Sequence, residues 1–197
     1  SVLVTSQGLV MIDSPQLPSH AAQWRQELAR LGEVRYLINT EPHSDHITGD
    51  FYFPVPLIAH QATRESISMT LVSDLKERIK QIDPAELRLM GNYQLRLPDI
   101  TFSQRLSLYL GEHTLELIHL PGHTLGETGV YVPLERVIFT GDNIFYKVQT
   151  FMREAEPFLW LESLKKIQAL DVDTIVPGHG EICTKAYKLL TEEVGFP

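Results

Sequence analysis

Histidines and carboxylates recur at four points of this sequence, each directly after a short apolar run that is typical of a strand. The first point, residues 39–46, reads NTEPHSDH, and the others read PGHT at 121–124, TGD at 140–142 and PGHG at 177–180. Together they supply seven candidate ligands: Glu41, His43, Asp45, His46, His123, Asp142 and His179. Imidazole and carboxylate bind Zn, Mn and Fe, and adjacent Gly and Pro allow the turns that bring separate loops together. The pattern therefore predicts a metal site.

Any one of the eight histidines has a more ordinary interpretation, as a surface or hydrogen-bonded side chain. Four histidines and three carboxylates that all follow strands are not independent coincidences, which favours the metal interpretation for the set. Glu41 and His43 are two residues apart in an extended segment, so we expect their side chains to point the same way. The remaining histidines lack such a motif and are interpreted as structural or surface residues: His20, His60, His113 and His119.

The elements that must position these ligands are predicted from hydrophobic periodicity. Helices are expected at Ser19–Leu31, with Ser19 as N-cap and Gly32 as the stop, at about Ala62–Lys80, and at about Phe158–Leu170. Strands are expected at Leu9–Ile12, Val34–Ile38, Pro56–Ala59, Leu106–Leu110, Leu115–Leu120, Val130–Val132, Val137–Thr140 and Thr174–Val176. The strands between 106 and 132 are expected to be antiparallel neighbours, and the rest alternate with helices. This order predicts an α/β fold with mixed β-sheets, whose ligands bind beyond strand ends.

Composition limits the architecture and the partner. The chain has 197 residues, 43% of them hydrophobic, and we expect one domain over residues 1–197 because no repeat or linker divides it. The net charge of -8 argues against binding to nucleic acid or to an anionic membrane. The expected partner is therefore a small-molecule substrate, and the sequence leaves a homo-oligomer open.

The single cysteine, Cys183, excludes a disulfide framework and is interpreted as a small buried apolar residue. No apolar run approaches the ~20 residues that span a bilayer, and we expect a cytoplasmic protein. Because the chain begins with Ser1 and not with Met, the sequence leaves open whether a leader or an N-terminal strand has been removed.

The four motifs, in this order, resemble the metal motifs of the metallo-β-lactamase superfamily and extend over most of the chain. The resemblance implies the metallo-β-lactamase fold, an αβ/βα four-layer sandwich with mixed β-sheets and a dinuclear site at one edge. The family's first motif is His-x-His-x-Asp-His, and this sequence carries Glu41 in place of the first His. Transfer residue by residue implies two ligand sets with Asp142 as the bridge: Glu41, His43 and His123 for one metal, and Asp45, His46 and His179 for the other.

Glu41 leaves two alternatives open for the first metal. It ligates through a carboxylate oxygen, which favours a harder ion such as Mn or Fe, or it turns away and leaves a half-built site. The cofactors implied by the resemblance are two divalent metal ions, with Zn expected first and Mn or Fe as alternatives.

The resemblance also implies a metallohydrolase. Two divalent ions lower the pKa of a shared water, and the metal-bridged hydroxide attacks a small ester, thioester or lactone. The catalytic residues are then Asp142, as the bridge, and Asp45, which either protonates the leaving group or serves as a ligand alone. A β-lactamase is not expected, because antibiotic-hydrolysing members replace the bridging Asp, whereas Asp142 matches the glyoxalase II, lactonase and phosphodiesterase branches.

Two other functions remain open. One is a mononuclear iron dioxygenase of the persulfide dioxygenase kind, which in this family keeps one iron bound by two His and the Asp equivalent to Asp142. The other is a metal-binding relative whose first site has decayed at Glu41. Retention of the other six candidate ligands argues against decay.

Further residues near the motifs have two interpretations each. Asp13 closes a strand and resembles the family Asp that orients ligands, with an ordinary turn residue as the alternative. Tyr146 lies where some lactonase-like members place a phenol that binds the substrate carbonyl. The segments 66–93 and 144–160 either line the substrate pocket or belong to the core.

Overall fold

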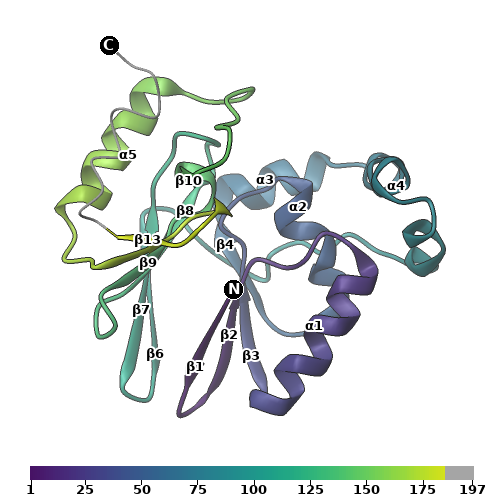
Figure 1. The fold of residues 1–197 in the computed structure, drawn as a ribbon, viewed down its shortest axis with the longest axis horizontal. Helices are drawn as coiled ribbons and strands as arrows, with labels where there is room; N and C mark the ends of the chain where they lie inside the picture. Colours follow the sequence, from purple (N-terminus) through teal and green to yellow (C-terminus); the bar gives the residue numbers. More distant parts are fainter. Residues whose placement is uncertain (185–197) are drawn as a thin grey trace. The chain divides into compact units, whose positions relative to one another are not determined.

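The computed structural model describes residues 1–184 of the chain. The described residues divide into two compact units, one over Ser1–Thr101 and a second that begins at Phe102 (Figure 1). This division leaves the single domain expected over the whole chain a prediction. Among the described residues, none of the helices combines the length and the apolar character needed to cross a bilayer.

The sheet of the first unit carries the first ligand motif at the end of its third strand. Its five strands run in the order β1 (Val2–Thr5), β2 (Gly8–Ile12), β3 (Val34–Ile38), β4 (Leu57–His60) and β5 (Ile100–Phe102). The pair β1 and β2 is antiparallel, whereas β2 with β3 and β3 with β4 are parallel. The sheet is therefore mixed, as predicted.

Helices of the first unit are α1 (Pro18–Leu31), α2 (Ser44–Ile47), α3 (Gln61–Met69), α4 (Val72–Ile82) and the 3-10 helices η1 (Thr48–Tyr52) and η2 (Glu86–Met90). Helix α1 packs Ala21 and Leu28 into one cluster with Leu9 and Leu37 of the sheet (Figure 1). It begins at Pro18 and not after an N-cap at Ser19, because proline suits the first helical position. Its predicted stop at Gly32 is confirmed.

The single helix predicted over about 62–80 is wrong, because the chain forms two helices there. Thr70 and Leu71 take extended conformations between α3 and α4, and Leu71 is 61% exposed while Ile67 and Leu75 are buried. The hydroxyl of Thr70 donates to the carbonyl of Ser66 at the end of α3. Such local hydrogen bonds compete with continuation of a helix.

The second unit is built on a six-stranded sheet. Its order is β13 (Cys183–Thr184), β11 (Thr174–Val176), β9 (Val137–Phe139), β8 (Thr128–Val132), β7 (His113–His119) and β6 (Arg105–Leu110). The run β6, β7, β8 is antiparallel, as predicted, and β9 with β11 is parallel. A separate parallel pair joins β10 (Phe145–Tyr146) and β12 (His179–Gly180). The α/β class with mixed sheets is thus confirmed.

Helix α5 (Pro157–Ala169) covers this sheet (Figure 1). Trp160, Leu164 and Ile167 pack in one cluster with buried strand residues that include Ile138. Leu161, predicted to be buried, is only partly so. The strands that sequence periodicity missed have two to four residues each, which is too short for an alternating pattern to register: β1, β5, β10, β12 and β13.

Candidate metal centre

In the first unit, Glu41 lies between two imidazoles. It follows β3, while His43 precedes α2 and His46 lies within it. The Oε2 atom of Glu41 is 2.9 Å from Nδ1 of His43, and its Oε1 atom is 3.2 Å from Nε2 of His46. The Glu41 side chain has no solvent exposure. The expectation that Glu41 and His43 point the same way is confirmed, and Glu41 faces His46 as well.

Asp45 lies farther from these groups. Its Oδ2 atom is 3.9 Å from Nε2 of His46, and its side chain is 28% exposed. It is therefore the candidate ligand of this unit that combines closeness to an imidazole with access to water.

Asp13 fixes the orientation of His46. Its carboxylate accepts hydrogen bonds from the backbone N–H and the hydroxyl of Thr40, and Oδ2 lies 2.9 Å from Nδ1 of His46. Because an ionised carboxylate only accepts, Nδ1 of His46 donates and Nε2 is the nitrogen presented toward Glu41. Asp13 adopts a positive φ of 56°, a conformation that costs free energy in a non-glycine residue and is held by these contacts.

A second buried carboxylate, Asp50, is connected through Ser14 and Asn39 to the backbone of His46. Its Oδ1 atom accepts from the hydroxyl of Ser14 at 2.6 Å and from the amide of Asn39 at 3.3 Å. Ser14 and Asn39 also donate to the backbone carbonyl of His46. Burial raises the pKa of Asp50 to about 7, because its effect is larger than the opposite effect of the hydrogen bonds from Ser14 and Asn39 to the Asp50 carboxylate. Sequence analysis missed this residue, whose signal is an acidic side chain four residues after the motif.

In the second unit, aromatic rings hold His123. The ring centroids of Phe145 and Trp160 each lie 5.5 Å from the centroid of the His123 ring, and both contacts are edge-on. The turn itself lies against α5: a Cβ at Gly122 would stand 2.4 Å from the Cα of Trp160, and the carbonyl of Gly122 accepts from the N–H of Glu156. The glycine of the PGHT motif is therefore required by close backbone approach.

Asp142 occupies the corresponding place between the imidazoles of this unit. Its Oδ2 atom is 3.5 Å from Nε2 of His123 and 3.3 Å from Nε2 of His179. A Cβ at Gly178 would lie 1.9 Å from Oδ1 of Asp142, so the glycine before His179 is what lets the two motifs approach. The His179 ring stacks on Phe145 and is 42% exposed.

Glu127 joins the two turns that carry His123 and Asp142. It is fully buried, its Oε1 atom accepts from the backbone N–H of Asp142 at 2.9 Å, and its Oε2 atom accepts from the hydroxyl of Thr124 at 3.1 Å. Sequence analysis did not single out this residue. The available signal was an acidic side chain placed directly before the fully buried strand β8.

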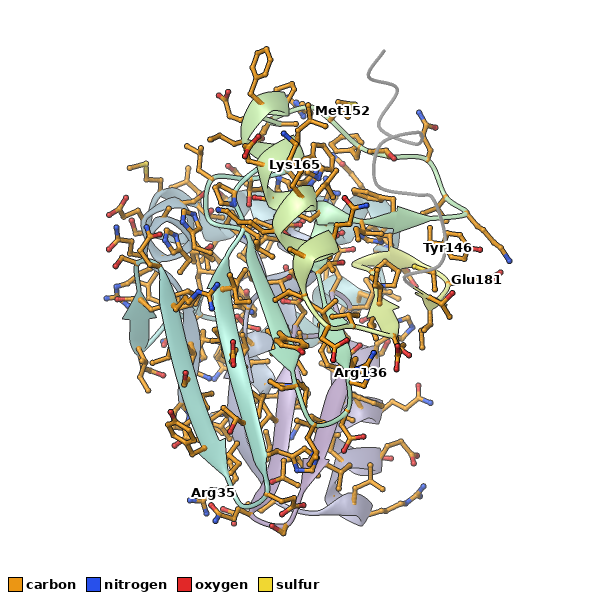
Figure 2. The ribbon with its side chains drawn as sticks, turned by 90° about the vertical axis from the view of Figure 1, so that its left-hand side faces the viewer. Arg35, Arg136, Tyr146, Met152, Lys165 and Glu181 are labelled. Carbon is orange, nitrogen blue, oxygen red and sulfur yellow. The ribbon has the colours of Figure 1, made fainter. Side chains whose placement is uncertain are left out.

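Tyr146 lies on β10 beside the strand that carries His179. Tyr146 pairs with Gly180, and its carbonyl accepts from the N–H of Glu181; both Tyr146 and Glu181 are labelled in Figure 2. Lys147 lies over the Tyr146 ring and forms an ion pair with Glu181. The assignment of Tyr146 to a substrate carbonyl stays a prediction.

The other histidines have structural or surface positions, as expected. His60 caps α3 by accepting from the N–H of Ala62, and Nε2 of His119 donates to the carbonyl of Leu125. His113 lies against Glu135. His20 is exposed.

The remaining assignments concern burial. Cys183 is buried, as predicted. Of the apolar residues considered for a pocket, Met90 and Tyr93 belong to the core, whereas Met69 is 81% exposed.

The donor atoms of each unit fit a divalent metal. Donors that share a tetrahedral ion at 2.0–2.2 Å lie about 3.4 Å apart, and the carboxylate-to-imidazole distances within each unit run from 2.9 to 3.5 Å. Imidazole nitrogen and carboxylate oxygen are also the ligand types that zinc takes.

Comparison with known proteins identifies the family. The family model described as the metallo-beta-lactamase superfamily matches residues 1–179, and the chain belongs to this superfamily. Members of this superfamily bind divalent metals, typically zinc.

Curated relatives include two proteins named hydroxyacylglutathione hydrolase. The one from Bartonella quintana is 38% identical over 86 residues, which cover 43% of this chain and 34% of the relative. The one from Mesorhizobium japonicum is 34% identical over 122 residues, covering 59% and 46%. The matched parts thus span less than half the length of these relatives.

Among solved structures, a metallo-beta-lactamase from Pontibacter korlensis matches with a TM-score of 0.72. The match covers 96% of this chain and 82% of that chain at 19% identity. At this identity the similarity shows the fold alone, and it confirms the metallo-β-lactamase fold predicted from the motifs.

Proposed function

We propose that this protein is a metal-dependent hydrolase of a small thioester, ester or lactone. The observation that carries the proposal is the arrangement within each unit, where a buried carboxylate lies between two imidazoles at ligand-to-ligand distances. A family whose members bind divalent metals supports the same conclusion. The partner remains a small molecule, with neither nucleic acid nor membrane expected.

The proposed ligands fall into the two sets implied by the family motif. One ion would be held by Glu41, His43 and His123 and the other by Asp45, His46 and His179, and Asp142 would contribute to both. When bound, two such ions would lower the pKa of a shared water far below its value in bulk water and would polarise the substrate carbonyl.

The residues of the chain then have distinct tasks. Asp13 holds His46 with Nε2 available for ligation, since Nδ1 donates to the Asp13 carboxylate. Asp45 is exposed enough to pass a proton to the leaving group. Glu127 and the Gly178 contact keep Asp142 in place without occupying its Oδ2 atom.

A thioester is the first substrate class to test, because two relatives are named hydroxyacylglutathione hydrolase. The metal-free protein would be reconstituted with Zn, Mn or Fe. Under anaerobic conditions it would then be offered a hydroxyacylglutathione, an activated aryl ester and a lactone. We expect hydrolysis of at least one of them, measured as thiol, phenol or acid release, and none after removal of metal.

Two results would replace the proposal. Turnover that requires dioxygen, follows iron occupancy and consumes oxygen in proportion to substrate would establish the dioxygenase instead. Absence of stoichiometric metal after supplementation with all three ions would end both the hydrolase and the dioxygenase.

A further inference from the structure

The contacts of Glu41 go beyond the two alternatives that its sequence position leaves open. A side chain turned away would face neither motif histidine of this unit, and a ligand of the first metal alone would need only His43 beside it. The two carboxylate oxygens are divided, with Oε2 against Nδ1 of His43 and Oε1 against Nε2 of His46. These histidines belong to different ligand sets.

The contact with His46 is informative because of its geometry. Nδ1 of His46 lies against the Asp13 carboxylate, so Nε2 is the ring nitrogen that faces Oε1 of Glu41. The Glu41 side chain is fully buried, and its Oε1 atom lies 3.2 Å from this nitrogen. The separation is close to that of two donors on one tetrahedral ion.

The second unit contains the same arrangement around Asp142. One oxygen of Asp142 lies 3.5 Å from His123 and 3.3 Å from His179, which again belong to different sets. Asp142 thus serves both sets through one atom. Glu41 has the same relation to His43 and His46, but through two oxygens.

We infer that Glu41 is a second carboxylate bridge, with Oε2 bound to the ion of His43 and Oε1 to the ion of His46. A carboxylate joins two ions through its separate oxygens, which suits the roughly 3.5–4 Å separation of two-metal sites. The histidine of the family motif offers one ligand nitrogen to a single ion, so the substitution changes how the ions are joined. This inference rests on the proposed function for the presence of two ions.

The decisive experiment is a crystal structure of the zinc-loaded wild-type protein, with each ion located by anomalous scattering. We expect Oε1 and Oε2 of Glu41 at about 2.0–2.2 Å from different ions. Both oxygens on one ion, or neither on any ion, would overturn the inference. This measurement needs no variant to fold.

A titration with Co²⁺, followed by its absorption spectrum, gives an independent test. Glu41→Gln is expected to weaken both stepwise binding constants by at least about tenfold, whereas the matched change Asp45→Asn weakens one. Glu41→His, which restores the family motif, is expected to recover one constant and leave the other weak. Loss of a single constant in Glu41→Gln would contradict the inference.

Neither measurement uses turnover, so the two proposals can fail separately. A bridged pair of ions in a protein that hydrolyses nothing would leave the inference standing and end the proposed function. Hydrolysis by a protein whose Glu41 contacts one ion would do the reverse.

Discussion

Each of the two units places a carboxylate between two imidazoles, but the units use different side chains to do so. In the first unit, Glu41 reaches two imidazoles with two oxygens, and in the second unit Asp142 reaches two imidazoles with one. The longer, fully buried Glu41 follows a strand directly, whereas the shorter Asp142 depends on the close approach permitted by Gly178. The comparison teaches that the position of a carboxylate between donors matters more than its family residue type.

The supports behind these carboxylates also differ. Asp50 in the first unit accepts from neutral side chains and has a raised pKa. Glu127 in the second unit accepts from the backbone N–H of a candidate ligand, Asp142. Removing each support in turn tests whether the two units are equally dependent on them.

The largest effect is expected from Asp142→Ala. It removes the oxygen shared by His123 and His179, so we expect metal affinity and turnover to fall by more than about 100-fold, beyond the losses typical of supporting residues. Metal analysis after dialysis and steady-state rates would measure it. Retention of two ions and of wild-type kcat would show that this carboxylate is not the bridge.

Asp50→Asn is expected to change how stability depends on pH. The folded pKa of about 7 lies above the ordinary 3.8, so the folded state binds more protons, and Asp50 costs stability as pH rises from about 4 to about 7. The slope is at most about 1.4 kcal/mol per pH unit. Urea unfolding of both proteins should show the free energy of unfolding of the variant rising relative to that of wild type as the pH rises to about 7. Parallel curves of this free energy against pH would refute the raised pKa of Asp50.

Asp13→Asn tests the support of His46. The amide offers one acceptor oxygen where the carboxylate offers two, so it cannot accept from the Thr40 backbone N–H and from His46 at the same time, and the ring loses its fixed tautomer. We expect a 10- to 100-fold loss of metal affinity, measured by chelator competition. Unchanged affinity would mean that Asp13 is only a turn residue.

The smallest effect is expected at Glu127. Glu127→Ala should lower metal affinity by about tenfold, and Glu127→Gln should recover most of it, because an amide can still accept from the N–H of Asp142. The matched control is Glu86→Ala, since buried Glu86 also accepts from a backbone N–H, that of Ser19, which is not a candidate ligand. Both alanine variants should unfold more easily, and equal metal affinities would assign Glu127 a structural role alone.

Much of the candidate site was predictable because its signals are local. Each ligand motif follows a strand whose apolar run is visible in a few residues, and the glycines and histidines of PGHT and PGHG stand side by side in the sequence. The α/β class and the antiparallel run from 105 to 132 were predicted for the same reason. The helix over 62–80 was not, because the backbone is extended at Thr70 and Leu71, where the hydrophobic periodicity continues without interruption.

The sequence by itself identified the candidate ligands and the order in which the strands present them. Only the tertiary structure decided their partners: Asp13 meets His46 across 33 residues, and Glu127 meets Asp142 across 15. It also decided that Glu41 lies between His43 and His46. Such contacts depend on how side chains pack after the backbone has turned, and no local pattern of residue types encodes that packing.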